Sequence, residues 1–346
     1  MKQKLILAVL LTGCISLLFA YNPSAGGELM YQLQTPDVLA DGASVAGGAL
    51  FSASAEHIAI NPALTSEEQR IVINLDYTAL AGSSYGQTMF LGTIFPTKYG
   101  VLTFSGQGIF ATLDELDLGN CFTMRAGFSK DISEELYVGT DLACTIGSGF
   151  GIYGDFGFYY KAGSVKWLPF LKDVKFGGVL SGCGLPYNNS SKSALDSEAA
   201  VTGFPGLVTP HAGLSGTLVT TDKFKMGLSA DLAFPTFQNI VFDTGLQMLI
   251  ADFVRVRTGW NFNLRECMAG KASYIPSIAV SAKIAFKTQN SFMNKNGWAE
   301  SEVEIPAGYR QLTGGVHAIS AGATLHLGMQ DNKEPVIKLW DGEDDE

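Results

Sequence analysis

Hydrophobic and polar residues alternate along most of the chain, and this alternation predicts short β-strands. Successive residues of a strand point to opposite faces, so a period of two indicates a strand with one apolar and one polar face. In one clear case Phe224, Met226 and Leu228 alternate with Lys225 and Gly227. The pattern predicts about fourteen strands, approximately at residues 71–80, 85–95, 99–110, 120–129, 135–147, 151–163, 173–185, 208–220, 223–234, 238–249, 253–263, 274–287, 298–305 and 313–328.

Charged residues keep to one face of the predicted strands. Arg255 and Arg257 share a face, whereas Val254 and Val256 stand on the other. A soluble sandwich would turn the apolar face toward its core, and a membrane barrel would turn it toward lipid and the polar face toward the lumen. The number of strands, and whole faces built of Phe, Leu, Ile and Met, favour an all-β, transmembrane antiparallel β-barrel. The cations expected in its lumen are Arg125, Lys175, Lys225, Arg255, Arg257 and Lys283.

The N-terminal segment has the order of an export signal. Lysines precede the apolar run Leu5–Leu11, and Ala20 is a suitable cleavage edge. The residues ending in Cys14 also resemble a lipoprotein cleavage box, in which Cys14 would carry lipid, but the sequence stays apolar after this cysteine. We therefore expect an exported chain that is cleaved near Ala20, and export supports the barrel over the soluble sandwich.

The stretch Ala40–Arg70 does not alternate and is rich in Gly, Ala and Ser. It is broken at Asn61-Pro62, where the proline lacks a backbone N–H and holds the preceding residue near extended geometry. Thr65 or Ser66, followed by acidic residues and a glutamine, predicts the start of a helix. A compact irregular segment ahead of a run of strands predicts a short hatch in the lumen of the barrel.

These patterns divide the chain into four parts, and the connections suggest an orientation. The parts are a signal peptide (1–20), an N-terminal arm and hatch (21–70), the transmembrane β-barrel (71–329) and an acidic C-terminal tail (330–346). Short connections alternate imperfectly with longer ones, which is typical of short periplasmic turns and longer external loops. The longer connections lie near residues 112–119, 186–207 and 265–273.

Composition excludes several classes of function. The 346 residues carry a net charge of −10, with acidic residues concentrated at the C-terminus, so nucleic-acid binding is not expected. The histidines and glycine-rich runs match no catalytic, metal or phosphate-binding pattern. We therefore expect no enzyme activity, no metal and no cofactor. The later cysteines fit no zinc spacing and are either disulfide-bonded or packed as small side chains: Cys121, Cys144, Cys183 and Cys267.

The order of these parts resembles a known family. The residues that carry the resemblance are Gly47-Gly48-Ala49, the run Ser52–Ala55 and Asn61-Pro62-Ala63-Leu64, ahead of about fourteen strands. This order is similar to that of the FadL-like outer-membrane transporters for long-chain fatty acids, and most similar to their spirochaete (treponemal) branch. The resemblance implies a barrel closed by an N-terminal hatch and a ligand that leaves through an opening in the wall. The residues after Ala63 depart from the family's motif, and the chain is shorter than typical members.

The resemblance directs attention to a site for a fatty-acid carboxylate. We expect Arg255 and Arg257 to bind it, with Arg125 as a third candidate, because guanidinium groups pair bidentately with carboxylates. Phe51 and Phe253 are candidates for an apolar pocket, with ordinary packing as the alternative. For the arginines the alternative is a solvated network with acidic lumen residues: Asp141, Asp155, Asp231 and Asp243.

The motif Asn61, Pro62 and Ala63 has two interpretations, a rigid turn before the first strand or a hatch corner that moves or anchors during transport. The function expected from all of these features is diffusion-driven uptake of hydrophobic molecules through the outer membrane, with long-chain fatty acids as the predicted ligands and membrane lipid around the barrel. Two alternatives remain open. One is a secretion-shuttle or interaction barrel that binds a protein partner, and the other is a small-solute porin.

Overall fold

The structure is a computed structural model of the chain. The residues that it describes are 38, 40, 44–50, 52–83, 85–113, 116–147, 150–185, 191–193, 196–201, 208–237, 239–268, 270, 272–312 and 315–328. The predicted signal peptide, most of the N-terminal arm, the acidic tail and Phe51 lie outside these residues.

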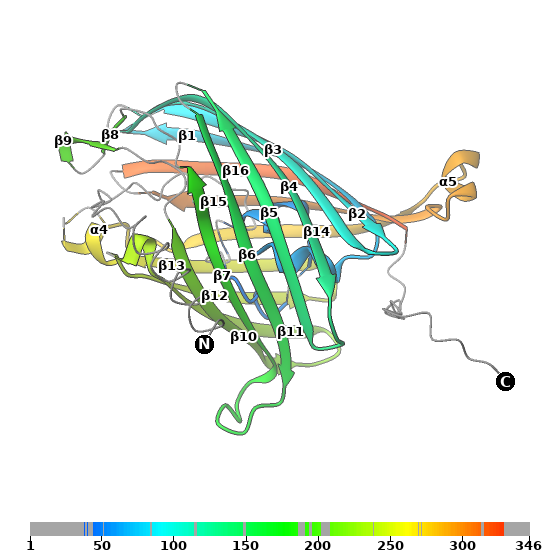
Figure 1. The fold of residues 1–346 in the computed structure, drawn as a ribbon. Helices are drawn as coiled ribbons and strands as arrows, with labels where there is room; N and C mark the ends of the chain where they lie inside the picture. The colour runs from blue at the N-terminus through cyan, green and yellow to red at the C-terminus, as the bar shows by residue number, and fades with distance from the viewer. Residues whose placement is uncertain are drawn as a thin grey trace, which may run out of the picture.

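Fourteen antiparallel strands form a closed barrel (Figure 1), which confirms the predicted fold class. The first strand, β1, is hydrogen-bonded to both β2 and β16, and this pairing closes the wall. The barrel strands are β1 (Ile71–Gly82), β2 (Tyr85–Thr97), β3 (Gly100–Leu113), β4 (Leu116–Asp131), β5 (Leu136–Ile146), β6 (Phe150–Gly163), β7 (Lys172–Leu185), β10 (Thr209–Thr220), β11 (Phe224–Ala233), β12 (Val241–Ile250), β13 (Val254–Asn263), β14 (Ser277–Lys287), β15 (Glu300–Gln311) and β16 (Val316–Leu327).

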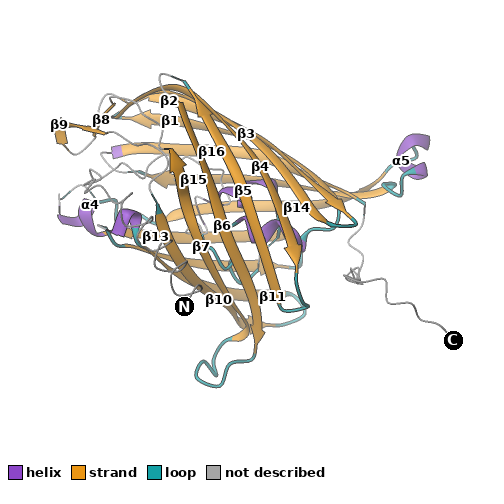
Figure 2. Cartoon of the chain, in the orientation of Figure 1, coloured by secondary structure: helices purple, strands orange, loops and turns teal. Residues whose placement is uncertain are grey.

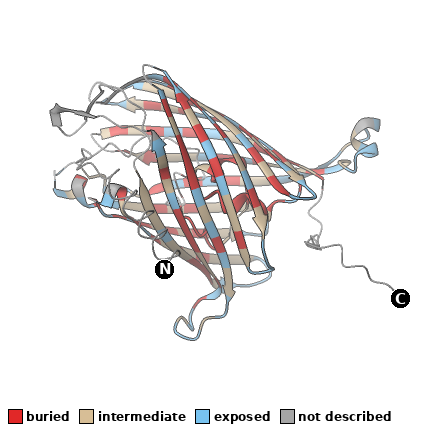
Figure 3. Cartoon of the chain, viewed as in Figure 1, coloured by how far each residue is buried: buried red, intermediate tan, exposed pale blue. Residues whose placement is uncertain are grey.

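The two faces of the wall are arranged as in a membrane barrel. Leu75 and Met124 point outward and are 61% and 48% exposed, whereas their neighbours Asp76 and Arg125 point inward and are buried. Figure 3 shows the resulting alternation of exposed and buried bands along the strands. The apolar faces therefore form the outer surface and the polar faces line the lumen, which is the inverse of a soluble sandwich.

The two ends of the barrel differ in their connections (Figures 1 and 2). The terminus end is the end at which β1 begins and β16 ends, and the short helix α5 (Ser291–Lys295) extends beyond it between β14 and β15. The loop end is the opposite one, and it carries the two-stranded sheet β8 (Ser191–Ser193) and β9 (Asp196–Val201) and the helix α4 (Leu264–Met268). In the part of the chain that the structure describes, no helix is both long and apolar enough to cross a membrane.

The described part of the hatch, residues 44–50 and 52–70, contains two short 3-10 helices that lie inside the barrel, η1 (Ala55–Ala59) and η2 (Pro62–Glu67). A third such helix, η3 (Pro235–Phe237), lies between β11 and β12. The predicted helix start at Thr65 or Ser66 is wrong, because Pro62 begins η2 and Asn61 is its N-cap. Proline at the first helical position loses no hydrogen bond, and the Asn61 side chain satisfies the next free N–H.

Glycines of the wall let the hatch backbone lie directly on the strands. An ideal Cβ at Gly177 would lie 2.0 Å from the carbonyl oxygen of Val45, and one at Gly157 would lie 2.0 Å from the side-chain oxygen of Asn61. The hatch also lies on Gly139 through the backbone of Pro62 and Ala63, and on Gly92 and Gly227 through the methyl groups of Ala55 and Ala49. Side chains at these positions would hold the hatch away from the wall, so the glycines set the fit of the hatch in the lumen.

We expect Gly177→Ala to loosen the hatch without opening the barrel. The added methyl group meets the Val45 backbone, which cannot move aside as a flexible side chain can, and overpacking of this kind costs about 1–3 kcal/mol. The rate of proteolysis within residues 44–70 of the folded barrel should rise about tenfold, since about 1.4 kcal/mol corresponds to that factor. The matched control is Gly106→Ala, where the new methyl group meets only the edge of the outward-facing Phe122 ring. Equal proteolysis in both variants would contradict this prediction.

Candidate functional site

The corner of the hatch is held by Asn61, whose side chain is fully buried. Its Nδ2 donates hydrogen bonds to the carbonyl oxygens of Val45 (2.8 Å) and Phe158 (2.9 Å), and its Oδ1 accepts one from the Ala63 N–H (3.0 Å). One side chain thus joins two parts of the hatch to strand β6. Pro62 is the next residue and lies against Gly139 of β5. The structure therefore places the three motif residues at a corner fixed to the wall.

Other hydrogen bonds hold the N-terminal part of the hatch to strands β11 and β12. Asp231 on β11 accepts hydrogen bonds from the Ser44 hydroxyl (2.8 Å) and the Val45 N–H (2.6 Å). Gln247 on β12 accepts one from the Leu50 N–H (2.6 Å). In the barrel order β6 is separated from β11 by β7 and β10, so these bonds and the Asn61 bond fix the hatch to a span of several strands.

A buried ion cluster fixes the C-terminal end of the hatch to the last two strands. Arg70 pairs with Glu68 (2.9 Å) and with Glu302 of β15 (2.7 Å), and His326 of β16 contacts Glu68 at 3.2 Å. Burial alone would raise the pKa of Glu68, but hydrogen bonds with His326 and Arg70 lower it by a larger amount. The resulting pKa is about 2. Glu68 is therefore ionised at neutral pH and contributes to holding the hatch next to the β1–β16 closure.

This cluster predicts a pH dependence at acid pH. The pKa of Glu68 in the folded protein, about 2, is below its ordinary value of 4.5, so ionised Glu68 stabilises the docked hatch above pH 4.5. That stability is lost as the pH falls from 4.5 toward 2. We expect amide hydrogen exchange in residues 62–70 to accelerate over this range, after correction for the intrinsic rate. In the Glu68→Gln variant the hatch should be docked less firmly at neutral pH, and hydrogen exchange should change less between pH 4.5 and 2. A pH profile of exchange identical to that of the parent would contradict the role given to Glu68.

Arg125 lies in a network of paired charges. Its Nη1 contacts Asp141 (2.7 Å) and Asp155 (2.8 Å), and its Nη2 donates a hydrogen bond to the Tyr153 hydroxyl (2.9 Å). All four side chains are buried. This is the arrangement expected under the alternative of an acidic lumen network. An incoming carboxylate would have to compete with two aspartates for this guanidinium group.

Arg255 and Arg257 share one carboxylate. Glu304 of β15 lies 3.2 Å from Arg255 Nη1 and 3.7 Å from Arg257 Nη2, and Arg257 also donates to the Ser281 hydroxyl (3.1 Å). The two arginines therefore lie on one lumen face, as their spacing predicts. The partner they share is Glu304, which the sequence reasoning missed. The acids at 302 and 304 alternate with Val303 in the predicted strand 298–305, and this spacing was the available signal.

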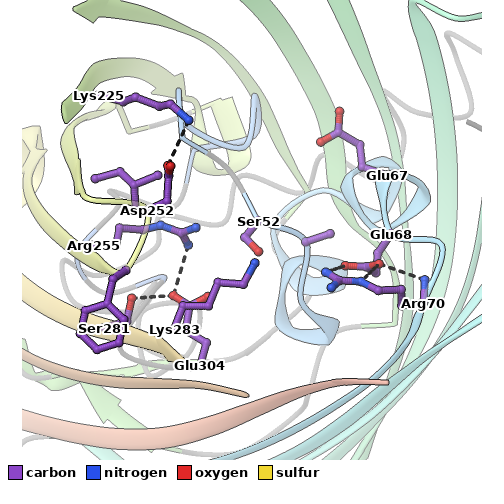
Figure 4. Close-up of a pocket in the computed structure, with 13 residues that line it drawn as sticks. Ser52, Glu67, Glu68, Arg70, Lys225, Asp252, Arg255, Ser281, Lys283 and Glu304 are labelled. Atoms are coloured by element: carbon purple, nitrogen blue, oxygen red, sulfur yellow. Dashed lines mark hydrogen bonds and ion pairs between the residues drawn. The ribbon is translucent and has the colours of Figure 1, made fainter. Parts of the chain in front are cut away.

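A polar cavity of about 380 Å³ lies beside Arg255 at the terminus end (Figure 4). The hatch supplies one side of it, and strands and turns from β11 to β15 supply the other. Phe253 also lines it, in the turn before β13, and is 48% exposed. The cavity is lined by Ser52, Ala53, Glu67, Glu68, Arg70, Lys225, Leu249, Asp252, Phe253, Arg255, Ser281, Lys283 and Glu304. Charged groups dominate this lining, so the cavity suits a polar or ionised group.

Other candidate chemistry is limited in the described residues. No group of three or more His, Cys, Asp or Glu side chains there is arranged to hold a metal ion. The four later cysteines are free thiols, and Cys121 is buried in β4. Their packing matches the simpler of the two interpretations drawn from the sequence.

Comparison of the fold with solved structures gives clear similarities, although no family model and no curated protein matches the sequence. The CymD monoaromatic hydrocarbon channel aligns with a TM-score of 0.52 and 12% identity over 87% of this chain and 98% of that one. A deltaS2 mutant of the TodX monoaromatic hydrocarbon channel aligns with a TM-score of 0.52 and 10% identity over 86% and 99%. At these identities the similarity shows a shared barrel fold.

Proposed function

We propose that this protein is an outer-membrane channel that admits hydrophobic small molecules by diffusion, and that long-chain fatty acids are among them. The observation that carries the proposal is a hatch bonded across the lumen of a closed barrel, to β6 through Asn61 and to β15 through Arg70, together with an apolar outer wall. Such a segment restricts free flow of solutes and leaves entry to molecules that bind inside the barrel. The shared fold of two monoaromatic hydrocarbon channels supports this proposal. Membership of the FadL-like family and of its spirochaete branch belongs to the same proposal.

Arg255 and Arg257 are the proposed partners of a ligand carboxylate, and Arg125 is the third candidate. The position of Arg255 and Arg257 on one lumen face, next to the same carboxylate of Glu304, supports the first two. In the described residues, Arg255 Nε is buried and has no hydrogen-bond acceptor. Phe253 would contact the apolar portion of the ligand where it lines the same cavity.

Uptake into liposomes tests the proposal. The mature protein would be reconstituted in phospholipid vesicles, and entry of radiolabelled palmitate and toluene would be compared with entry into empty vesicles and into vesicles that hold an unrelated barrel. We expect saturable palmitate binding to the folded protein and faster entry than in both controls. A folded barrel that neither binds nor accelerates either compound would refute the proposal.

The charged cavity specifically favours a second candidate, a porin for small polar solutes. A porin predicts steady ion conductance in planar bilayers, whereas a bonded hatch predicts little conductance until it is displaced. Conductance of the unmodified protein therefore separates the two functions. A large conductance with no hydrophobic uptake would favour the porin.

A further inference from the structure

The cavity at the terminus end is a space between the hatch and one part of the wall. Ser52 and Ala53 form its hatch side, and the residues opposite come from neighbouring strands: Leu249 on β12, Arg255 on β13 and Ser281 on β14. Elsewhere the hatch lies directly on wall glycines, as at Gly157 and Gly177. The space beside Ser52 is thus a natural place for a ligand to pass the hatch.

The cavity opens at the terminus end, and a contact between the hatch and β12 lies further inside the barrel. Lys225 and Asp252 lie at its outer rim, where their side chains are 39% and 65% exposed and pair at 3.1 Å. Further into the barrel than Leu249 on β12, Gln247 accepts the hydrogen bond from the Leu50 N–H and lies against Gly48. The cavity is therefore a vestibule with an exposed rim, and the contact between Gln247 and the hatch lies inward of its lining.

The lining is rich in charged groups, with four basic and four acidic side chains. Lys225 on β11, Arg255 on β13 and Lys283 on β14 project into it (Figure 4), each next to an acidic side chain, and the Ser52 hydroxyl faces them from the hatch. Arg255 also has a buried Nε–H with no acceptor in the described residues. A carboxylate can accept hydrogen bonds from such donors, whereas a plain hydrocarbon would separate them from water without replacing the lost hydrogen bonds.

We propose that an amphipathic acid leaves the barrel axially through this vestibule, with its ionised head group on Arg255 and Lys283, after the contact between Gln247 and Leu50 opens. This inference rests on the proposed function and deepens it. It names the exit, and it predicts that acids use this exit and uncharged hydrocarbons do not. It also differs from the lateral opening in the wall that the family resemblance implies.

Ser52 and Ser54 provide a matched pair of positions for the test. Ser52 lines the vestibule, whereas Ser54 is buried at the start of η1. Each would be changed to Cys in the full mature protein, reconstituted in vesicles and treated with a negatively charged, water-soluble methanethiosulfonate reagent. The parent protein, which keeps its native cysteines, gives the background labelling. Labelling rate, octanoate uptake, toluene uptake and ion current would be measured before and after treatment.

We expect Ser52→Cys to label at least tenfold faster than Ser54→Cys, and labelling to reduce octanoate uptake at least fivefold while toluene uptake stays the same. Equal labelling rates of the two variants would overturn the inference that Ser52 lines an open vestibule. Fast labelling with unchanged octanoate uptake would overturn the exit and leave the proposed function standing. If the parent takes up neither octanoate nor toluene, the proposed function fails. The exit is then judged by ion current alone. An absent current, or a current that does not change after labelling of Ser52→Cys, overturns the exit.

The inner contact can be tested separately. Gln247→Met removes the acceptor for the Leu50 N–H at similar side-chain length, whereas Gln247→Glu keeps an acceptor oxygen. We expect faster octanoate uptake in the Met variant than in the Glu variant, with both barrels folded by circular dichroism. Equal rates in the two variants would show that this contact does not control the exit.

Discussion

Asn61→Asp is expected to release the hatch from the wall while the barrel stays closed. The change is isosteric, but it replaces a donor with an acceptor next to the carbonyl oxygens of Val45 and Phe158. Each of these buried carbonyls loses its hydrogen bond from Asn61, at a cost of about 1–3 kcal/mol, and a buried carboxylate facing them adds repulsion. The effect on docking should therefore exceed that of any single glycine substitution in the wall. Ion conductance should rise from near zero to that of an open barrel.

The control for this variant is Asn294→Asp, which makes the same chemical change at an exposed position in α5. A glutamate-specific protease should cut the Asn61→Asp hatch at Glu56, which is buried in the parent. The control should resist cleavage as the parent does. If Asn61→Asp keeps both low conductance and protease resistance, the corner does not anchor the hatch.

Glu304→Gln is expected to increase the affinity for an ionised ligand, whereas Arg255→Gln with Arg257→Gln should decrease it. Glu304 occupies both guanidinium groups, so its loss makes them available to an incoming carboxylate. A hydrogen bond to a charged group contributes about 1.5–3 kcal/mol. Affinity for palmitate, measured by calorimetry on the folded barrel, should therefore change by about tenfold to a hundredfold in opposite directions.

A neutral ligand separates electrostatics from changes in shape. Hexadecanol has a chain of the same length as palmitate and no charge, so its affinity should be similar in the parent and in both sets of variants. The double arginine variant leaves Glu304 buried without these partners, which destabilises the barrel. The triple variant, which adds Glu304→Gln, removes that penalty and should still bind palmitate weakly. Unchanged palmitate affinity in the triple variant would exclude the arginines as the carboxylate site.

Much of the wall could be predicted from the sequence, because a strand that separates two environments repeats its polarity every two residues. The predicted segment 120–129 lies within β4, and the parity of Arg125 places it in the lumen as found. The segment 298–305 was too short, since β15 continues to Gln311 through Pro306, which interrupts the expected pattern. In a sequence pattern proline indicates the end of a strand, even at positions where the hydrogen bonding of the strand tolerates it.

The hatch and the candidate site were predicted less completely, because their contacts join residues far apart in the chain. Asn61 could be read as a corner, but not as a donor to Phe158, which is 97 residues later. In the same way, parity brought Arg255 and Arg257 together without showing that Glu304 lies between them. Periodicity reports which face a residue occupies, whereas pairing across the lumen depends on barrel closure and strand stagger.

The bonds of the hatch also constrain the order of folding. Ser44 is bonded to Asp231, 187 residues later, and Arg70 to His326, 256 residues later. These loops are long, and the residues that receive the hatch belong to strands that are synthesised after it. The hatch therefore cannot complete its bonds until the last strands have joined the first. Its docking is a late step of assembly, and a nascent barrel must pass through a stage in which the lumen is still unblocked.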